Sequence, residues 1–139
     1  MEVFMKKLVI YYSLDGNTAF VARTMAGAVG ADILELKIKN EQKHSGFLKY
    51  FWGGRQVMMK TKPELLPFDK RPEDYDVLFI GTPVWAFTYA PALATFFSSV
   101  HLKAKKIALF CCSGGTKGKA LKKMAEQLPG NEIIGETLL

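Results

Sequence analysis

A short polar loop lies between an apolar run over residues 7–12 and a helical pattern over 17–29. Its residues are Ser13, Leu14, Asp15, Gly16, Asn17 and Thr18. The start of a helix presents backbone N–H groups without intrahelical partners and a partial positive charge, which together suit a phosphate. The loop has no lysine or arginine, so neutral donors would hold the phosphate. Its spacing matches neither G-x-x-x-x-G-K-S/T nor G-x-G-x-x-G, and by itself it equally fits an ordinary polar turn before a helix.

A second candidate region covers residues 81–91, after a predicted strand over 77–80. It holds three aromatic residues within five positions, Trp85, Phe87 and Tyr89. Aromatic side chains at the end of a strand can stack on a planar ligand, and nearby backbone amides can bind its edge. The alternative, slightly favoured for this loop alone, is a hydrophobic plug beneath the loops.

A third loop, residues 112–118, follows a predicted strand over 107–111 and contains Gly114 and Gly115. Consecutive glycines let a ligand approach the backbone closely and expose N–H donors. The alternative is a flexible turn before the next helix.

Other site chemistries have little support. The two histidines, His44 and His101, are expected at the surface rather than as bases or ligands. The adjacent Cys111 and Cys112 are expected to be buried thiols on opposite faces of a strand end, with a small chance of redox reactivity at Cys112. We predict no catalytic residue and no metal site, since no metal-ligand spacing is present.

The elements that position these loops follow from hydrophobic periodicity. Strands are expected at 7–12, 31–38, 77–80, 107–111 and 132–139, and helices at 17–29, 90–100 and 117–128. Alternating strands and helices predict an α/β fold, a doubly wound five-stranded parallel sheet with helices on both faces. A further helix is expected within 43–67, packed on the sheet.

Length and composition agree with this predicted α/β fold. The 139 residues suit a single domain over 1–139, with 49% hydrophobic and 23% charged residues. The net charge is +6, and the segment Lys37–Lys62 alone carries seven basic residues and one acid, Glu41. Neither a signal peptide nor a disulfide framework is indicated, and the uncharged stretch 77–100 is broken by glycine and prolines. We therefore expect a soluble cytoplasmic protein.

Taken together, the three loops resemble those of the flavodoxin-like family. The first has that family's phosphate-loop form, T/S-x-x-G-x-T, from Ser13 to Thr18. The tryptophan-bearing loop follows the third strand as Gly81-Thr82-Pro83-Val84-Trp85, and the fourth strand's loop contains Ser113-Gly114-Gly115. Each motif is weak alone, but three in order at successive strand ends are fairly specific. The resemblance implies a three-layer sheet with strand order 2-1-3-4-5.

The resemblance also implies FMN as the cofactor. Residues 13–18 would then hold its phosphate, and the backbone of 82–86 with the Trp85 side chain would flank the isoalloxazine ring. The segment 112–117 would lie at the other edge of the ring. The cofactor residues implied in the second and third loops are Thr82, Pro83, Val84, Trp85, Ala86, Cys112, Ser113, Gly114, Gly115 and Thr116.

Three features depart from long-studied flavodoxins. The chain is basic and has no tyrosine in the third loop, which predicts a less strongly reducing flavin and a redox partner with an acidic face, docked by Lys37–Lys62. The final helix of the family is missing after 132–139, so one sheet face is exposed, covered by 43–67, or capped in a homodimer. Asp15 replaces a hydroxyl residue beside the phosphate and is expected to point to solvent.

The function expected from this resemblance is an FMN-binding redox protein that carries electrons between protein partners. One alternative is an NAD(P)H-dependent quinone or nitro-compound reductase that uses FMN, and another is a flavin-less binding domain of the same fold. The basic, aromatic Lys37–Lys62 stretch could bind nucleic acid or an anionic membrane, but a solvated basic face is the favoured interpretation. We therefore predict neither nucleic acid nor membrane as a partner.

Overall fold

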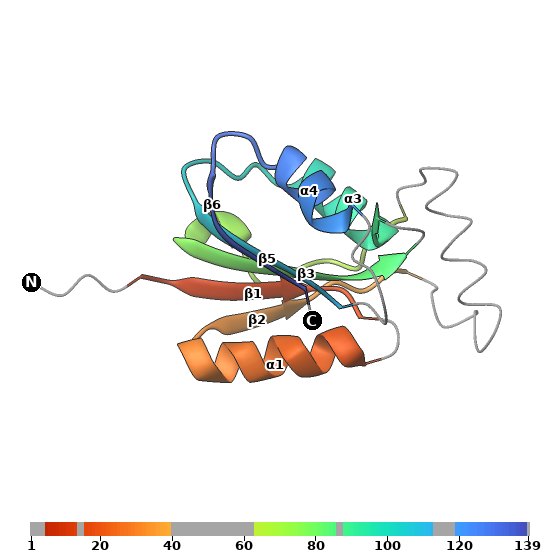
Figure 1. The fold of residues 1–139 in the computed structure, drawn as a ribbon, viewed down its shortest axis with the longest axis horizontal. Coiled ribbons are helices and arrows are strands. Elements are labelled where there is room, and N and C mark those ends of the chain that lie inside the picture. The colour runs from red at the N-terminus through yellow and green to blue at the C-terminus, as the bar shows by residue number, and fades with distance from the viewer. Residues whose placement is uncertain (1–4, 14–15, 40–62, 86–87, 113–118, 139) are drawn as a thin grey trace, which may run out of the picture.

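A parallel β-sheet forms the centre of the molecule in a computed structural model that describes residues 5–13, 16–39, 63–85, 88–112 and 119–138. Its strands lie side by side in the order β2-β1-β3-β5-β6 (Figure 1). Their bounds are β1 Lys7–Tyr11, β2 Asp32–Glu35, β3 Val77–Trp85, β5 Lys106–Cys112 and β6 Glu132–Leu138. Counted along the chain, this is the predicted order 2-1-3-4-5, and each neighbouring pair is parallel. The predicted fold class is therefore confirmed.

The first strand is central because both of its faces are apolar. Leu8, Val9 and Ile10 have no exposed surface, although they point alternately to opposite sides of the sheet. Such a run is stable only where layers cover both faces, as in a doubly wound parallel sheet. β1 accordingly lies between β2 and β3.

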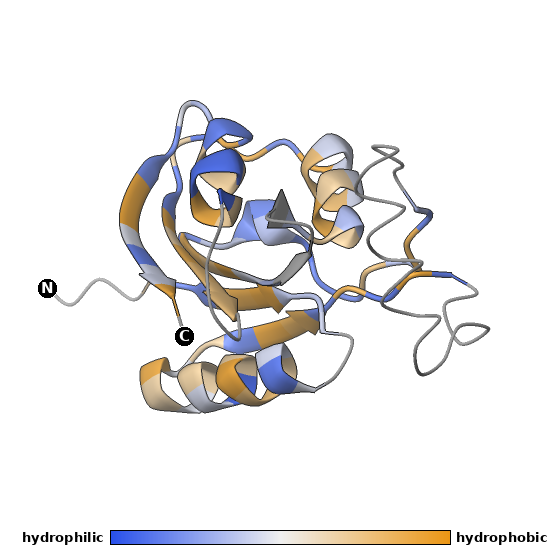
Figure 2. Cartoon of the chain, turned by 45° about the vertical axis from the view of Figure 1, so that its right-hand side comes forward, coloured by the Kyte–Doolittle hydropathy of each residue, from blue (hydrophilic) through white to orange (hydrophobic). Residues whose placement is uncertain are grey.

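Helices cover both faces of the sheet (Figures 1 and 2). Helix α1, Asn17–Val29, lies on one face, and α3, Pro91–Ser99, and α4, Ala120–Glu126, lie on the other. Under α1 the core consists of Val9, Tyr11, Ala19, Ala22, Ala26 and Phe110. The larger core on the α3 and α4 face includes Leu8, Ile10, Leu78, Ile80, Leu93, Phe96 and Met124.

Helix α1 has the predicted bounds. It begins after Gly16, whose φ of 92° is in the left-handed region. It ends at Gly30, which has φ 70° and donates its N–H to the carbonyl of Ala26. A left-handed glycine that closes the last turn is a common helix C-terminal cap, so the predicted stop signal is confirmed.

The third strand is longer than predicted, which corrects the expected loop over 81–91. β3 continues from Val77 to Trp85 and folds back into a short antiparallel strand, β4, Thr88–Tyr89. The extension is stable because β5 provides a hydrogen-bonding neighbour as far as the pair Pro83 and Cys112. The second candidate site is therefore a β-hairpin rather than an irregular loop.

Two other predicted elements are shorter in the structure, and a third falls mostly outside the described residues. The strand over 31–38 is ordered as β2 only over 32–35, because Ile38 leaves β1 and pairs with Leu65 in an antiparallel bridge. The helix over 117–128 begins at Ala120 and ends at Glu126. Most of the helix expected within 43–67 lies outside the described residues. Its last part, 63–67, is described and is not helical.

The uncharged stretch 77–100 contains β3, β4 and the whole of α3. Pro91 occupies the first turn of α3, where its missing N–H costs no hydrogen bond. Within the described ranges, no helix has the length and apolar character needed to cross a bilayer.

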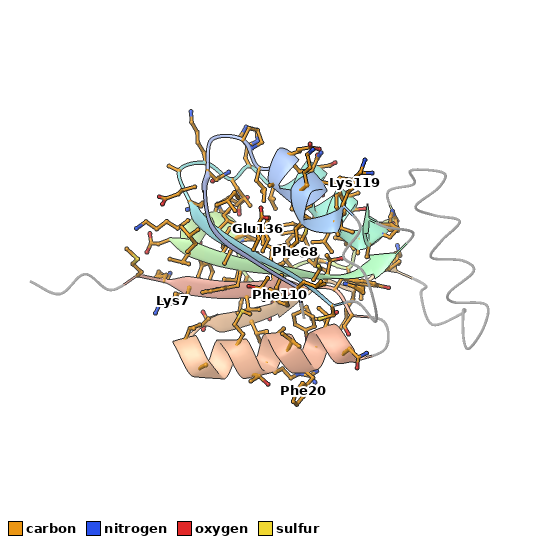
Figure 3. All side chains as sticks on the ribbon, viewed as in Figure 1. Lys7, Phe20, Phe68, Phe110, Lys119 and Glu136 are labelled. Carbon is orange, nitrogen blue, oxygen red and sulfur yellow. The ribbon has the colours of Figure 1, made fainter. Side chains whose placement is uncertain are left out.

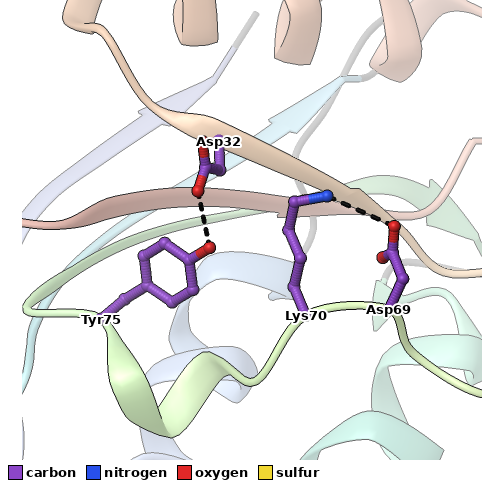
Figure 4. Close-up of polar contacts among 4 residues, drawn as sticks. All are labelled: Asp32, Asp69, Lys70 and Tyr75. Carbon is purple, nitrogen blue, oxygen red and sulfur yellow. Dashed lines mark hydrogen bonds and ion pairs between the residues drawn. The ribbon is translucent and has the colours of Figure 1, made fainter.

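A partly buried hydrogen bond links two strands of the sheet at their amino ends (Figure 4). The hydroxyl of Tyr75, just before β3, donates to Asp32 Oδ2 at the start of β2, over 2.7 Å. This bond to the Asp32 carboxylate, with burial, raises the pKa of Tyr75 to about 12. The neighbouring Lys70 and Asp69 form an exposed ion pair at 3.3 Å.

Candidate functional site

The carboxyl ends of β1, β3 and β5 meet at one edge of the sheet. In the strand register Tyr11 lies beside Gly81, and Gly81 lies beside Phe110. The three predicted loops therefore leave the sheet at adjacent points. The connection from β1 runs to β2 on one side, and the chain after β3 runs to β5 on the other, so the strand order reverses between β1 and β3. Open parallel sheets bind ligands at such a point.

The described part of the first loop forms a turn that leads into α1. The N–H of Gly16 donates to Ser13 Oγ over 3.0 Å, and Ser13 is half-buried. The carbonyl of Gly16 accepts the helical hydrogen bond from the N–H of Phe20 at 2.9 Å. Leu14 and Asp15 lie outside the described residues, so the predicted orientation of Asp15 is not tested.

The first turn of α1 has the donor chemistry that a phosphate needs. The N-cap residue, Gly16, has no side chain that could cap the helix, and the first turn contains no acidic residue. The N–H groups of Asn17, Thr18 and Ala19 come before that of Phe20, the first with an acceptor inside the helix, so they point out of the helix end. Asn17 is exposed and Thr18 is buried. An uncapped, acid-free helix start at the switch point fits an anionic group.

The Thr82 side chain holds the β3–β4 hairpin closed. Its hydroxyl donates to the carbonyl of Pro83 at 2.7 Å and accepts the N–H of Ala90 at 2.9 Å. Thr82 has no exposed surface, so its hydroxyl serves the protein and does not face a ligand. The sequence gives no local signal for this role, because Thr82 and Ala90 come together only when the hairpin folds.

The hairpin backbone is fixed by two cross-strand pairs. Val84 pairs with Tyr89 and Trp85 with Thr88. This pairing places the backbone of 84 and 85 beyond the end of the parallel sheet. Ala86 lies outside the described residues.

The aromatic ring of Phe110 packs beneath the site, on the face of the sheet that α1 covers. A Cβ atom added to Gly81 would lie 2.1 Å from Phe110 Cζ, so the Phe110 ring packs directly on the β3 backbone. The ring is buried together with Tyr11 and the alanines of α1. Burial and the nearby Glu35 carboxylate raise the pKa of Tyr11. Sequence reasoning missed this contact, and the glycine at the end of an apolar strand was its only signal.

The end of β5 carries the described part of the third loop. Cys111 is buried in the core on the α3 and α4 face, and Cys112, the next residue, is partly exposed. The prediction of two buried thiols is therefore correct only for Cys111. Ser113, Gly114, Gly115 and Thr116 lie outside the described residues. His101 is exposed, as predicted, and His44 lies outside the described residues.

These features define the class of the protein: a doubly wound α/β domain with an acid-free helix start at its switch point. A family model described as Flavodoxin matches residues 6–139. Because this match covers nearly the whole chain, the chain belongs to the flavodoxin family. No curated protein sequence matches the chain.

Solved structures share the fold. A flavoprotein from Lactobacillus acidophilus, crystallised in complex with FMN, is 23% identical with a TM-score of 0.81, over 97% of this chain and 93% of that chain. A Bacteroides uniformis structure is 25% identical with a TM-score of 0.85, over 97% of this chain and 90% of that chain. The two-electron reduced flavodoxin of Megasphaera elsdenii is 18% identical with a TM-score of 0.61, over 95% and 84%.

Proposed function

We propose that this chain is an FMN-binding redox protein that carries electrons between protein partners. The observation that carries the proposal is the uncapped, acid-free start of α1 beside the β3–β4 hairpin, at the switch point of a flavodoxin-family sheet. Family membership and the FMN complex of the Lactobacillus acidophilus flavoprotein support FMN as the ligand.

In this proposal each candidate segment has one role. Residues 13–18 hold the phosphate, the hairpin residues 82–86 with the Trp85 side chain flank the ring, and 112–116 lie along its other edge. When bound, FMN supplies the one-electron and two-electron redox chemistry. The protein residues bind and orient it.

The described residues preorganise this site. The hydrogen bond from the Gly16 N–H to Ser13 Oγ fixes the turn that leads into α1. The Thr82 hydroxyl fixes the hairpin, and the Phe110 ring on Gly81 supports the strands beneath it. A site held in this way loses little entropy on binding its ligand.

The test of the cofactor is a visible absorption spectrum of the purified protein, recorded before and after addition of FMN and desalting. We expect a retained flavin band with a shifted or structured profile, and weaker retention of riboflavin, which lacks the phosphate. Equal retention of FMN and riboflavin would contradict the proposed phosphate loop. Loss of all flavin on desalting would leave a flavin-less binding domain as the better description.

A second assay tests the role as a carrier. We expect the FMN-loaded protein to accept electrons from a separate reductase and to show no steady-state oxidation of NADH or NADPH with a quinone. Sustained turnover of NADH or NADPH would assign the chain to the quinone or nitro-compound reductases instead.

A further inference from the structure

Three lysines lie on the solvent side of α4 and are here called the α4 lysine stripe. They are Lys119, Lys122 and Lys123, and all three are exposed. Residues three and four apart share one face of a helix, so these side chains project together. Figure 3 shows Lys119 pointing away from the sheet at the start of α4.

The stripe has no ion-pair partner within the described ranges. Its nearest acid along the helix is Glu126, and no ion pair joins them. Some other exposed basic side chains do form ion pairs. Arg71 lies 3.4 Å from Asp74, and Lys39 lies 3.6 Å from Glu64. The α4 lysine stripe therefore presents uncompensated positive charge.

This arrangement disfavours the helix that carries it. Like charges three and four positions apart repel each other. Lys119 and Lys122 at the start of α4 also oppose the helix dipole, and the first turn contains no acid, whereas Lys123 reaches the last turn, where a cation is favourable. Residues that break a local stability rule, as Lys119 and Lys122 do, are expected at functional sites.

The stripe lies beside the candidate cofactor site. Helix α4 packs against β4, the returning strand of the β3–β4 hairpin. Burial and the α4 carboxylate of Glu126 raise the pKa of Tyr89 on β4. Lys119 stands at the start of α4, on the side where the chain arrives from the carboxyl end of β5.

We propose that the α4 lysine stripe is a docking surface for the acidic face of a protein redox partner. This rests on the proposed function, because it supplies the place where the partner meets the cofactor edge. Carboxylates on the partner match the exposed ammonium groups, and the attraction speeds the approach more than it strengthens the complex. The α4 lysine stripe is thus a second predicted docking site beside the Lys37–Lys62 segment.

The first test needs no flavin. Fluorescently labelled poly-L-glutamate is titrated with the full chain at low ionic strength, and its anisotropy is measured. The variant K119Q/K122Q is compared with K103Q/K106Q, which removes the same charge at the other end of the sheet, where Lys103 and Lys106 are also exposed. We expect about fivefold weaker binding for K119Q/K122Q, from the usual strength of exposed ion pairs, and almost none of that loss for the control.

The second test measures electron transfer from the reduced, FMN-loaded protein to hexacyanoferrate(III), a trivalent anion. Two unit charges about 12 Å from such an anion change its local concentration about tenfold at 10 mM ionic strength and about twofold at 0.15 M. We expect K119Q/K122Q to slow the reaction by these factors and K103Q/K106Q to leave it unchanged. Oxidation by the cation hexaammineruthenium(III) should become faster in K119Q/K122Q.

The two tests fail in different ways. A chain that retains no FMN would refute the proposed function, and the poly-L-glutamate titration would still report on the stripe. Equal losses for the two variants would overturn the docking proposal, provided that thermal unfolding shows both to be folded. A single-stranded oligonucleotide that binds more tightly than poly-L-glutamate, and loses that binding in K119Q/K122Q, would also overturn it in favour of a nucleic-acid surface.

Discussion

Replacing Asn17 with aspartate should separate the phosphate-binding role of α1 from its role in the fold. Asn17 is the first residue of α1 and is exposed, and the first turn of this helix has neither an acid nor a side-chain cap. Aspartate has almost the same shape as asparagine and adds one negative charge. Asn17→Asp therefore tests the electrostatics of the helix start with little change in packing.

The two expected effects have opposite signs. In the flavin-free protein, the new carboxylate interacts favourably with the positive end of the helix and raises the free energy of unfolding by about 0.3–1 kcal/mol. In the complex it faces the phosphate. Coulomb repulsion between one charge and a phosphate dianion about 6 Å away costs about 1.4 kcal/mol even at the dielectric constant of water. That energy corresponds to about tenfold weaker FMN binding.

The assay compares FMN and riboflavin by fluorescence titration, together with urea unfolding of the flavin-free protein. Riboflavin affinity should not change, because riboflavin has no phosphate. Asn17→Ala measures the loss of the amide alone. Thr24→Asp places the same charge about 10 Å further along α1 and should weaken FMN binding less than about twofold. The reasoning is refuted if Asn17→Asp weakens FMN and riboflavin equally, or if it leaves FMN affinity unchanged.

Three further predictions concern the fold. Gly81→Ala should lower the free energy of unfolding by about 3 kcal/mol in urea denaturation, because its Cβ would lie 2.1 Å from Phe110 Cζ, and Phe110→Leu in the same chain should recover part of the loss. Tyr75→Phe should remove a pH dependence. Folding raises the pKa of Tyr75 from 10.0 to about 12, so the contribution of Tyr75 to the free energy of unfolding is full below pH 10 and falls by about 1.4 kcal/mol per pH unit up to pH 12. If Tyr75→Phe leaves the unfolding curve at alkaline pH unchanged, the hydrogen bond to Asp32 is contradicted. Ala104 has φ 59°, so Ala104→Gly should raise the thermal midpoint by relieving about 1 kcal/mol of backbone strain, and a lower midpoint would count against it.

The sequence predicted the elements whose signals are local. The apolar residues 8–10 indicated a strand buried on both faces, and the structure leaves them no exposed surface. The bounds of α1 followed from the polar loop before it and from Gly30 at its end, both within a few residues of the helix. The order of the three loops along the chain was enough to bring their described parts to one edge of the sheet, since parallel strands end on the same side.

The details of the site came from contacts between distant residues. The sequence placed an irregular loop after Ile80, whereas β3 continues because β5 pairs with it as far as Cys112. The pairing of Ile38 with Leu65 likewise depends on a distant residue. Neither β5 as the partner of β3 nor Leu65 as the partner of Ile38 can be recognised from the neighbouring residues in the sequence.

The sequence by itself thus determined the fold class, the family and the order of the candidate loops. Only the tertiary structure decided that the Thr82 hydroxyl closes a hairpin and that the Phe110 ring occupies the space above Gly81. The physical reason is that helix caps and hydrophobic periodicity depend on residues close by in the sequence. The length of a strand, and whether a polar side chain is hydrogen-bonded within the protein, depend instead on which distant segment packs against them.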